Sequence, residues 1–308
     1  MNDTSAPSTA GASTFGTGTG AAAAGPVPRP ATFHEADMEL AARPATAEPR
    51  SWYVRGQNFC VVYSRLDAGQ EIADDGLPDE HMILVPDSGR IEVATEGGES
   101  DLVAGPAVVV VPRGSVTVRA SVPGSLLRVF TARAEAVTRR AGNQSSYAVA
   151  DPMVEPLPDL PTVAGPATLR VHRLADVPTD PDRLGNIFQT DSLMVNWFPP
   201  HDGPRDGDTL SPHVHHDFEQ ATVTLGGRHV HHIRLPWSTR LRDWRDDQHV
   251  ECGSPSVTVI PPGNIHTTQA VGEGLHHLVD VFAPHRRDFR DNGWVLNEID
   301  YAARSVTA

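Results

Sequence analysis

One short segment, residues 211–220, concentrates the side chains best suited to chemistry. It reads SPHVHHDFEQ, with three histidines and two carboxylates within seven positions: His213, His215, His216, Asp217 and Glu219. Because alternate residues of a strand face the same side, His213 and His215 share a face. If the strand becomes regular towards ATVTL, Glu219 continues that face with Ala221, Val223 and Leu225, while His216 and Asp217 point elsewhere. The segment therefore predicts up to three ligands for a metal ion.

A fourth ligand has to come from another strand. The best candidate is His266 in VIPPGNIH, because the Pro-Gly turn before it aims the following strand into the same interior. Three imidazoles and one carboxylate form a mixed nitrogen and oxygen site. Such a site suits one divalent transition metal per chain, and the donor set alone does not choose among Fe, Mn, Ni, Co, Cu and Zn.

The rest of the chain predicts how these residues are held. Short strand-like runs separated by Gly and Pro turns recur about every ten residues, which is typical of all-β folds. We expect a disordered N-terminal tail over residues 1–45, since Ala, Gly, Ser, Thr and Pro bury too little apolar surface to order it. A first β domain then covers 46–133, a Pro-rich linker 134–168, and a second β domain 169–308.

The site residues resemble the two motifs of the cupin superfamily. Gly207, His213-Val-His215, Glu219 and Gly226 match the spacing of the first motif, and PPGNIH (261–266) matches the centre of the second. The outer positions of the second motif differ, with Pro255 and Ala270 in place of Gly and Asn. The resemblance implies two double-stranded β-helix (jelly-roll) barrels, with a metal held by His213, His215, Glu219 and His266.

The first barrel resembles a degenerate copy of the metal-binding cupin barrel, without its ligands. Where a metal-binding cupin has its second-motif histidine, PRGSVTVRA offers Thr117, and the region of the first motif, LPDEHMILVPD, has only His81. We expect no metal there. This barrel would serve as scaffold, dimer interface or cavity wall.

Other polar residues are candidates for acid-base chemistry or substrate binding. RHVHHIRL places His229 and His231 on one face, and LHHLVDVFAP places Asp280 with His276 and Leu278. Asp280, His229 and His231 are the candidate catalytic groups, although structural roles are open for each. The candidate substrate-binding residues are Asn196 or Trp197, of which one must face inward, Thr268, and Arg234 near a long loop.

Composition excludes several function classes. The net charge of -14 argues against nucleic acid as a partner, and no apolar run is long enough to span a membrane. Two cysteines far apart in the chain, Cys60 and Cys252, fit a reducing cytoplasm better than a disulfide framework. We expect a cytoplasmic homodimer that binds a small molecule.

Three functions remain open. An Fe(II) dioxygenase or related oxygenase is the preferred one, and an apolar lining of Ala221, Val223, Leu225 and Ile260 would favour it. A non-redox isomerase, epimerase, lyase or decarboxylase is the alternative, in which His or Asp280 moves a proton. Several inward His, Asp and Asn groups would favour this proton transfer on a polar substrate. A non-catalytic binding protein is the third.

Overall fold

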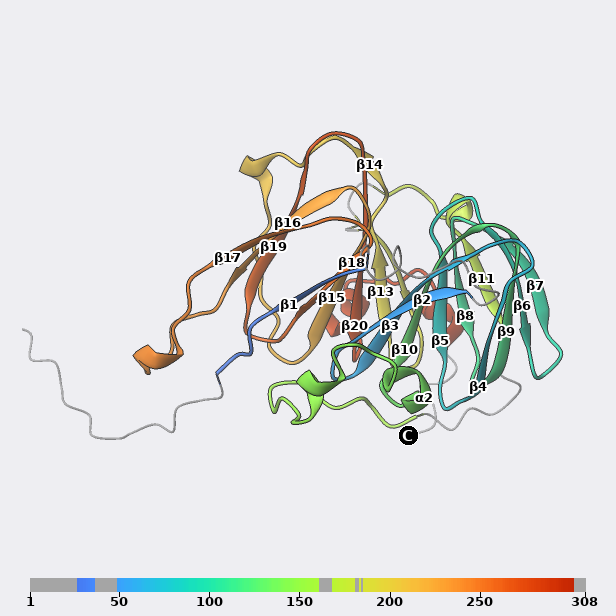
Figure 1. Cartoon of the computed structure of the whole chain (residues 1–308), viewed down its shortest axis with the longest axis horizontal. Helices are drawn as coiled ribbons and strands as arrows, with labels where there is room; N and C mark the ends of the chain where they lie inside the picture. The colour runs from blue at the N-terminus through green and yellow to red at the C-terminus, as the bar shows by residue number, and fades with distance from the viewer. Residues whose placement is uncertain (1–26, 37–48, 161–167, 181–182, 184, 302–308) are drawn as a thin grey trace, which may run out of the picture.

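Two β barrels lie side by side along the long axis of the molecule (Figure 1). The structure is a computed structural model that describes residues 27–36, 49–160, 168–180, 183 and 185–301. Each barrel consists of two sheets, and every pairing between the named strands is antiparallel. This confirms the predicted all-β class with two jelly-roll barrels. None of the helices in the described ranges is long and apolar enough to cross a membrane.

The N-terminal barrel pairs a six-stranded sheet with a four-stranded one. The larger has the order β11-β8-β5-β10-β3-β2, and the smaller β4-β9-β6-β7. The strands are β2 (Arg50–Arg55), β3 (Phe59–Leu66), β4 (Glu71–Leu77), β5 (His81–Val85), β6 (Arg90–Thr95), β7 (Ser100–Ala104), β8 (Ala107–Val111), β9 (Gly114–Val122), β10 (Gly124–Thr131) and β11 (Arg170–Arg173).

The C-terminal barrel pairs a seven-stranded sheet with a three-stranded one. The larger has the order β1-β18-β15-β20-β13-β12, with β14 beside β20, and the smaller has the order β17-β16-β19. The strands are β1 (Thr32–Glu35), β12 (Asn186–Gln189), β13 (Met194–Trp197), β14 (His201–Asp202), β15 (Glu219–Gly226), β16 (Arg228–Arg234), β17 (Gln248–Cys252), β18 (Ser256–Ile260), β19 (Ile265–Val271) and β20 (Leu275–Ala283).

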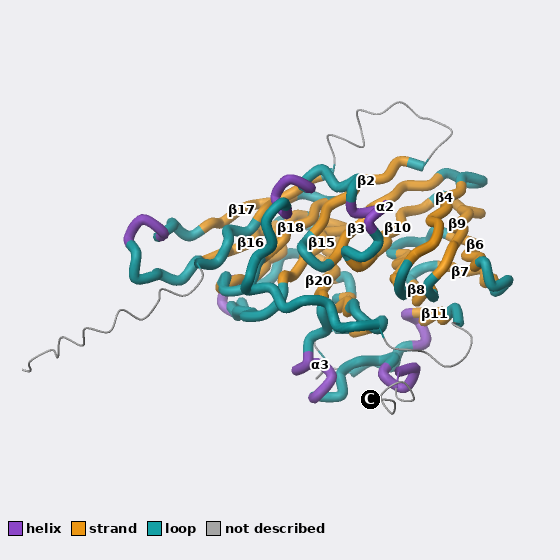
Figure 2. Tube along the Cα trace, turned by 90° about the horizontal axis from the view of Figure 1, so that it is seen from below, coloured by secondary structure: helices purple, strands orange, loops and turns teal. Residues whose placement is uncertain are grey.

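The barrels exchange edge strands, which shifts the expected domain boundaries. Strand β1 pairs with β18 of the C-terminal barrel, so residues 32–35 belong to a sheet and not to a tail. Strand β11, expected in the second barrel, pairs with β8 of the first. Residues 1–26 and 37–45 of the expected tail and 161–167 of the expected linker lie outside the described residues. The linker also holds α2 (Glu135–Thr138) and a 3-10 turn over Gln144–Tyr147, and short helices such as α3 (Arg287–Asp291) lie outside the sheets (Figure 2).

The two large sheets pack face to face and form one apolar core between the barrels. Its members come from both halves of the chain, including Trp52, Val61, Trp197, Val223 and Val281. Strand β15 is therefore buried on both faces, one against the N-terminal barrel and one towards its own barrel interior. In such a strand the apolar alternation does not tell the two faces apart.

The interiors of the two barrels differ in chemistry. The first is filled with apolar side chains such as Ile83, Val93, Val109 and Val118. In the second, the inward rows of β15 and β18 are polar: Gln220, Thr222, Thr224, Ser256 and Thr258, all buried. The inward-facing residues predicted for β15 are thus wrong, because Ala221 and Val223 belong to the core between the barrels and Leu225 packs against it.

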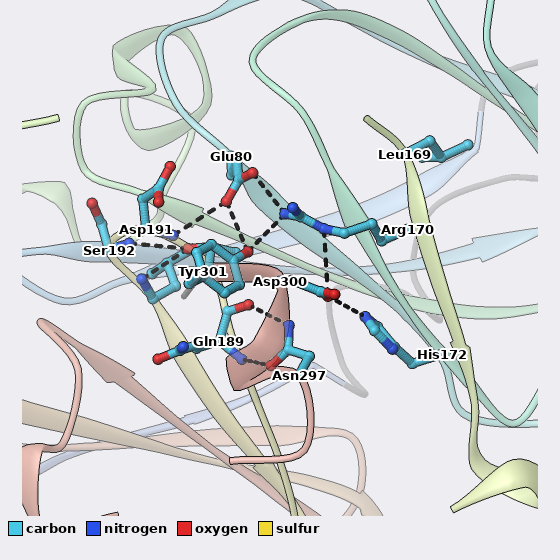
Figure 3. A network of polar contacts seen from close by, with 12 residues as sticks. Glu80, Leu169, Arg170, His172, Gln189, Asp191, Ser192, Asn297, Asp300 and Tyr301 are labelled. Carbon is cyan, nitrogen blue, oxygen red and sulfur yellow. Dashed lines mark hydrogen bonds and ion pairs between the residues drawn. The ribbon is translucent and has the colours of Figure 1, made fainter. Parts of the chain in front are cut away.

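A polar network ties the segment after β20 to the N-terminal barrel (Figure 3). Tyr301 donates to Oε2 of Glu80 at 2.9 Å, and Arg170 forms an ion pair with Glu80 at 2.6 Å. Nearby, the buried Asn297 side chain accepts from the backbone N–H of Gln189 and donates to its carbonyl, both at 2.9 Å. These contacts fix how the chain closes after the last strand.

Candidate metal centre

Three of the predicted ligands converge at one end of the C-terminal barrel. One ring nitrogen from each of His213, His215 and His266 lies within 4.8 Å of the other two. The backbones of His213 and His266 exchange two hydrogen bonds, of 3.0 and 2.8 Å, so the loop before β15 is locked to the start of β19. The histidine triad could hold a metal ion.

Hydrogen bonds set the tautomer that metal binding needs. A backbone carbonyl only accepts, so Nδ1 of His213 donates to Ser211 and Nδ1 of His266 donates to Asn264, both at 2.9 Å. Nε2 of each neutral ring is then left as a lone-pair donor. Burial lowers the pKa of His266 to about 4 and that of His215 to about 2, so both rings are neutral at pH 7.

Glu219 is the expected ligand that does not join the triad. Its carboxylate is turned out of the barrel, where it accepts hydrogen bonds from the backbone N–H of Gln57 and from the Tyr147 hydroxyl. Burial raises the pKa of Glu219 to about 7. The expectation fails for a geometric reason: residue 219 is on the β15 face that packs towards the first barrel.

Gln220, the next residue, points at the triad instead. Its Oε1 lies 3.0 Å from Nε2 of His215 and 3.4 Å from Nε2 of His266. Since Nδ1 of His266 carries that ring's proton, its Nε2 and the amide oxygen are both acceptors. Two acceptors facing each other repel unless a proton or cation lies between them. The donor set therefore fits a bound metal cation.

The triad opens on a cavity of about 610 Å³ inside the barrel. This volume is in the range of pockets that enclose small organic ligands. Its lining mixes polar and apolar groups: Asn196, Phe198, Pro199, His201, Arg205, Ser211, Pro212, His213, Gln220, His229, His266, Thr267, Thr268, Ala270, His276, Leu278, Asp280, Phe282, Arg286 and Phe289.

Asp280 lies in the middle of the large sheet with its carboxylate towards the cavity. It is in register with Asn196 on β13 and with Thr222 on β15, so these three side chains form one inward row. Thr222 donates to Oδ1 of Asp280 at 2.7 Å. Burial raises the pKa of Asp280 to about 6, against the opposing effects of the Thr222 hydrogen bond and the charge of Arg286.

The other predicted site residues divide into two groups. Asn196, Thr268 and His229 line the cavity. His231 is buried next to it, 3.1 Å from Thr268, and is not part of the lining. Of the alternatives Asn196 and Trp197, Asn196 therefore faces inward, while Trp197 packs into the core between the barrels. The expectation for Arg234 is wrong, because it is exposed and paired with Asp247.

Arg286 lines the cavity although it is not among the predicted site residues. Its guanidinium carbon lies 3.7 Å above the centre of the Phe289 ring, and it pairs with Asp288 at 2.5 Å. Its positive charge contributes to the lowered pKa of all three triad histidines. Nothing in the local sequence separates Arg286 from its neighbour Arg287, which is exposed and pairs with Glu155.

Comparison with known proteins supports the fold. No protein-family model and no curated protein matches the chain. Among solved structures, a variant oxalate decarboxylase from Bacillus subtilis is 14% identical over 84% of this chain and 79% of its own, with a TM-score of 0.50. The oxalate decarboxylase of Lactobacillus farciminis in its formate complex is 12% identical over 86% and 91%, with a TM-score of 0.48. A cupin 2 conserved barrel domain protein from Leptotrichia buccalis is 12% identical over 81% and 95%, with a TM-score of 0.39. The likeness is one of fold.

Proposed function

We propose that the C-terminal barrel is the active site of a metal-dependent enzyme that transforms a small carboxylic acid without redox chemistry. The reaction class is decarboxylation, isomerisation, epimerisation or elimination. The observation that carries the proposal is the shared cavity: His213 and His266 of the triad, the carboxylate of Asp280 and the guanidinium of Arg286 all line it.

The lining favours this class over the oxygenase. An oxygenase was favoured by an inward row of Ala221, Val223 and Leu225, and that row faces the other barrel. The inward row is instead Gln220, Thr222 and Asp280, with Asn196 beside them. Polar groups that donate, accept or exchange protons suit a reaction that moves a proton.

Each group then has a distinct role. A divalent metal held by the triad would supply Lewis-acid polarisation of a substrate carbonyl or carboxylate; the imidazole donors suit Fe, Mn, Ni, Co, Cu and Zn. Arg286 attracts the anionic group of the substrate. Asp280 holds or accepts the proton that the reaction moves, and Asn196 orients the substrate through its amide.

The cavity accommodates more than a two-carbon acid. Besides the triad, its lining includes His201, His229 and His276 together with the apolar Leu278 and Phe198. The ring centres of His201 and His276 are 5.5 Å apart, and those of His229 and His276 are 5.4 Å apart. The substrate therefore has room for an apolar body and a second polar end.

The deciding experiment compares turnover with and without oxygen. Metal-loaded protein is incubated under nitrogen with a panel of small carboxylic acids that includes oxalate, while CO₂ release and C–H exchange in D₂O are followed. We expect turnover without oxygen, lost in Asp280→Asn. The asparagine retains an oxygen that accepts from Thr222, so its metal content should match the wild type.

Asp202→Asn is the matched control, because this exposed carboxylate on β14 is not part of the cavity lining. Its turnover should equal that of the wild type. Turnover that stops under nitrogen and consumes oxygen in air would instead support the iron oxygenase. Absence of turnover with ligands still bound would support the non-catalytic binding protein.

A further inference from the structure

We infer that the fourth metal ligand is the amide oxygen of Gln220, and that Thr222 and Asp280 are positioning residues that hold this amide with its oxygen towards the histidines. This rests on the metal binding of the proposed function. In this inference the neutral amide of Gln220 takes the place of the Glu219 carboxylate as the fourth ligand. Thr222 and Asp280, which continue the inward row across the sheet, then help to build the site.

The strand geometry places these three side chains in line. Gln220 and Thr222 are two residues apart on β15 and share its inward face. Thr222 is paired with Asp280 on β20. Gln220 and Thr222 are almost completely buried, and β15 lies between β18 and β20, so the row has little freedom to shift.

While Asp280 is ionised, the hydrogen bonds in the row have only one consistent direction. Asp280 accepts from the Thr222 hydroxyl at 2.7 Å, which uses the only hydrogen that this hydroxyl has. Oγ1 of Thr222 can then only accept, and its partner is Nε2 of Gln220 at 2.9 Å. The NH₂ end of the amide is therefore fixed at Thr222, and the oxygen end is fixed at the triad.

The opposite orientation would damage the site. A flipped amide would direct its NH₂ group at Nε2 of His215 and of His266, where a cation requires electron pairs. An amide has two different ends and needs this orienting partner. A carboxylate has two equivalent oxygens and does not, which explains why a glutamine here is accompanied by a threonine and an aspartate.

The neutral ligand also bears on substrate class. A divalent ion held by three neutral imidazoles and an amide retains its full charge, whereas a carboxylate ligand would cancel one unit. With Arg286 in the same cavity, the centre attracts anions strongly. This agrees with a carboxylate substrate.

The test is a double-mutant cycle read by metal affinity, with Zn²⁺ and Co²⁺ titrated against a chromophoric chelator. We expect Thr222→Val to weaken binding by about tenfold or more, the usual effect of removing a group that orients a ligand. Thr222→Ser, which keeps the hydroxyl, should restore it. In the Gln220→Glu background the same Thr222→Val change should alter affinity by less than about twofold, since a carboxylate needs no orienting.

Thr224→Val is the matched control on the same strand and face, since the Thr224 hydroxyl has no hydrogen-bond partner among the described residues. Its affinity should equal that of the wild type, and the Co²⁺ absorption spectrum should change only in the Gln220 and Thr222 variants. The inference would be overturned, with the metal site left intact, if Thr222→Val lowered metal affinity equally in the wild-type and Gln220→Glu backgrounds. Wild-type metal affinity in Gln220→Ala would also overturn it. Wild-type protein that binds no metal would overturn the proposed function as well.

Discussion

The carboxylate of Glu219 accepts a hydrogen bond from the hydroxyl of Tyr147 at 3.3 Å, across 72 residues of sequence. The same carboxylate accepts from the backbone N–H of Gln57. Gly56 leaves room for this approach, because a Cβ there would lie 2.8 Å from Oε2 of Glu219 and 2.4 Å from the Phe59 ring. Glu219 thus joins the β15 strand to the N-terminal barrel and the segment after it.

Replacing Glu219 with alanine should lower stability and spare the metal. The change leaves the backbone N–H of Gln57 and the Tyr147 hydroxyl, both half-buried, without their acceptor, which costs about 1–3 kcal/mol of unfolding free energy. Metal content by elemental analysis should remain that of the wild type. Loss of the metal in a variant that still folds would return Glu219 to the ligand set.

Purified protein should carry close to one transition-metal ion per chain. His266→Ala should lose both the metal and the activity, because it removes one of only three imidazoles. His81→Ala should retain the metal, since His81 stacks on Phe130 inside the apolar first barrel. Elemental analysis giving a count near two would show that the first barrel also binds metal.

His81 should make the protein sensitive to mild acid. Burial, assisted by the charge of Arg128, lowers its pKa to about 3, below the ordinary value of 6.5. Between these values the unfolded chain binds a proton that the folded chain does not. The contribution of neutral His81 to the unfolding free energy is therefore complete above pH 6.5. It is lost as pH falls towards 3, at about 1.4 kcal/mol per pH unit.

Urea denaturation of the metal-free protein tests this. From about pH 7.5 to about pH 5, wild type should lose about 2 kcal/mol more than His81→Leu. The exposed His216→Leu is the control and should follow the wild type. Parallel losses in wild type and His81→Leu would show that His81 is protonated in the folded state or accessible to water.

Asn297→Ala should destabilise the closing segment of the chain. It removes both hydrogen bonds to the backbone of Gln189 and leaves two buried backbone groups unpaired. We expect a loss of about 2–4 kcal/mol in unfolding free energy. Asn292→Ala, an exposed asparagine after α3, should cost well under about 1 kcal/mol. Similar small effects in both would mean that water replaces the lost partners.

The sequence identified the histidine triad that could hold a metal through local geometry. Two histidines one residue apart must share a side of an extended chain, and the turn PPGNIH directs His266 to the same end of the barrel. The Gly and Pro turns between short strand-like runs also indicated the all-β class. A homodimer and a cytoplasmic location remain predictions.

Tertiary structure decided which neighbour, Glu219 or Gln220, faces the histidines. The alternation of side chains along a strand assigns residues to two faces but does not say which face points into the barrel. The apolar face can be taken as the inner one only when the opposite face is in contact with water. On β15 the apolar face meets the N-terminal barrel, so the polar row of Gln220 and Thr222 turns inward. The same packing took Trp197 out of the cavity and left Asn196 in it. The sequence by itself determined that the three histidines converge. The contact between the barrels decided which groups surround them, and no local sequence pattern encodes that contact.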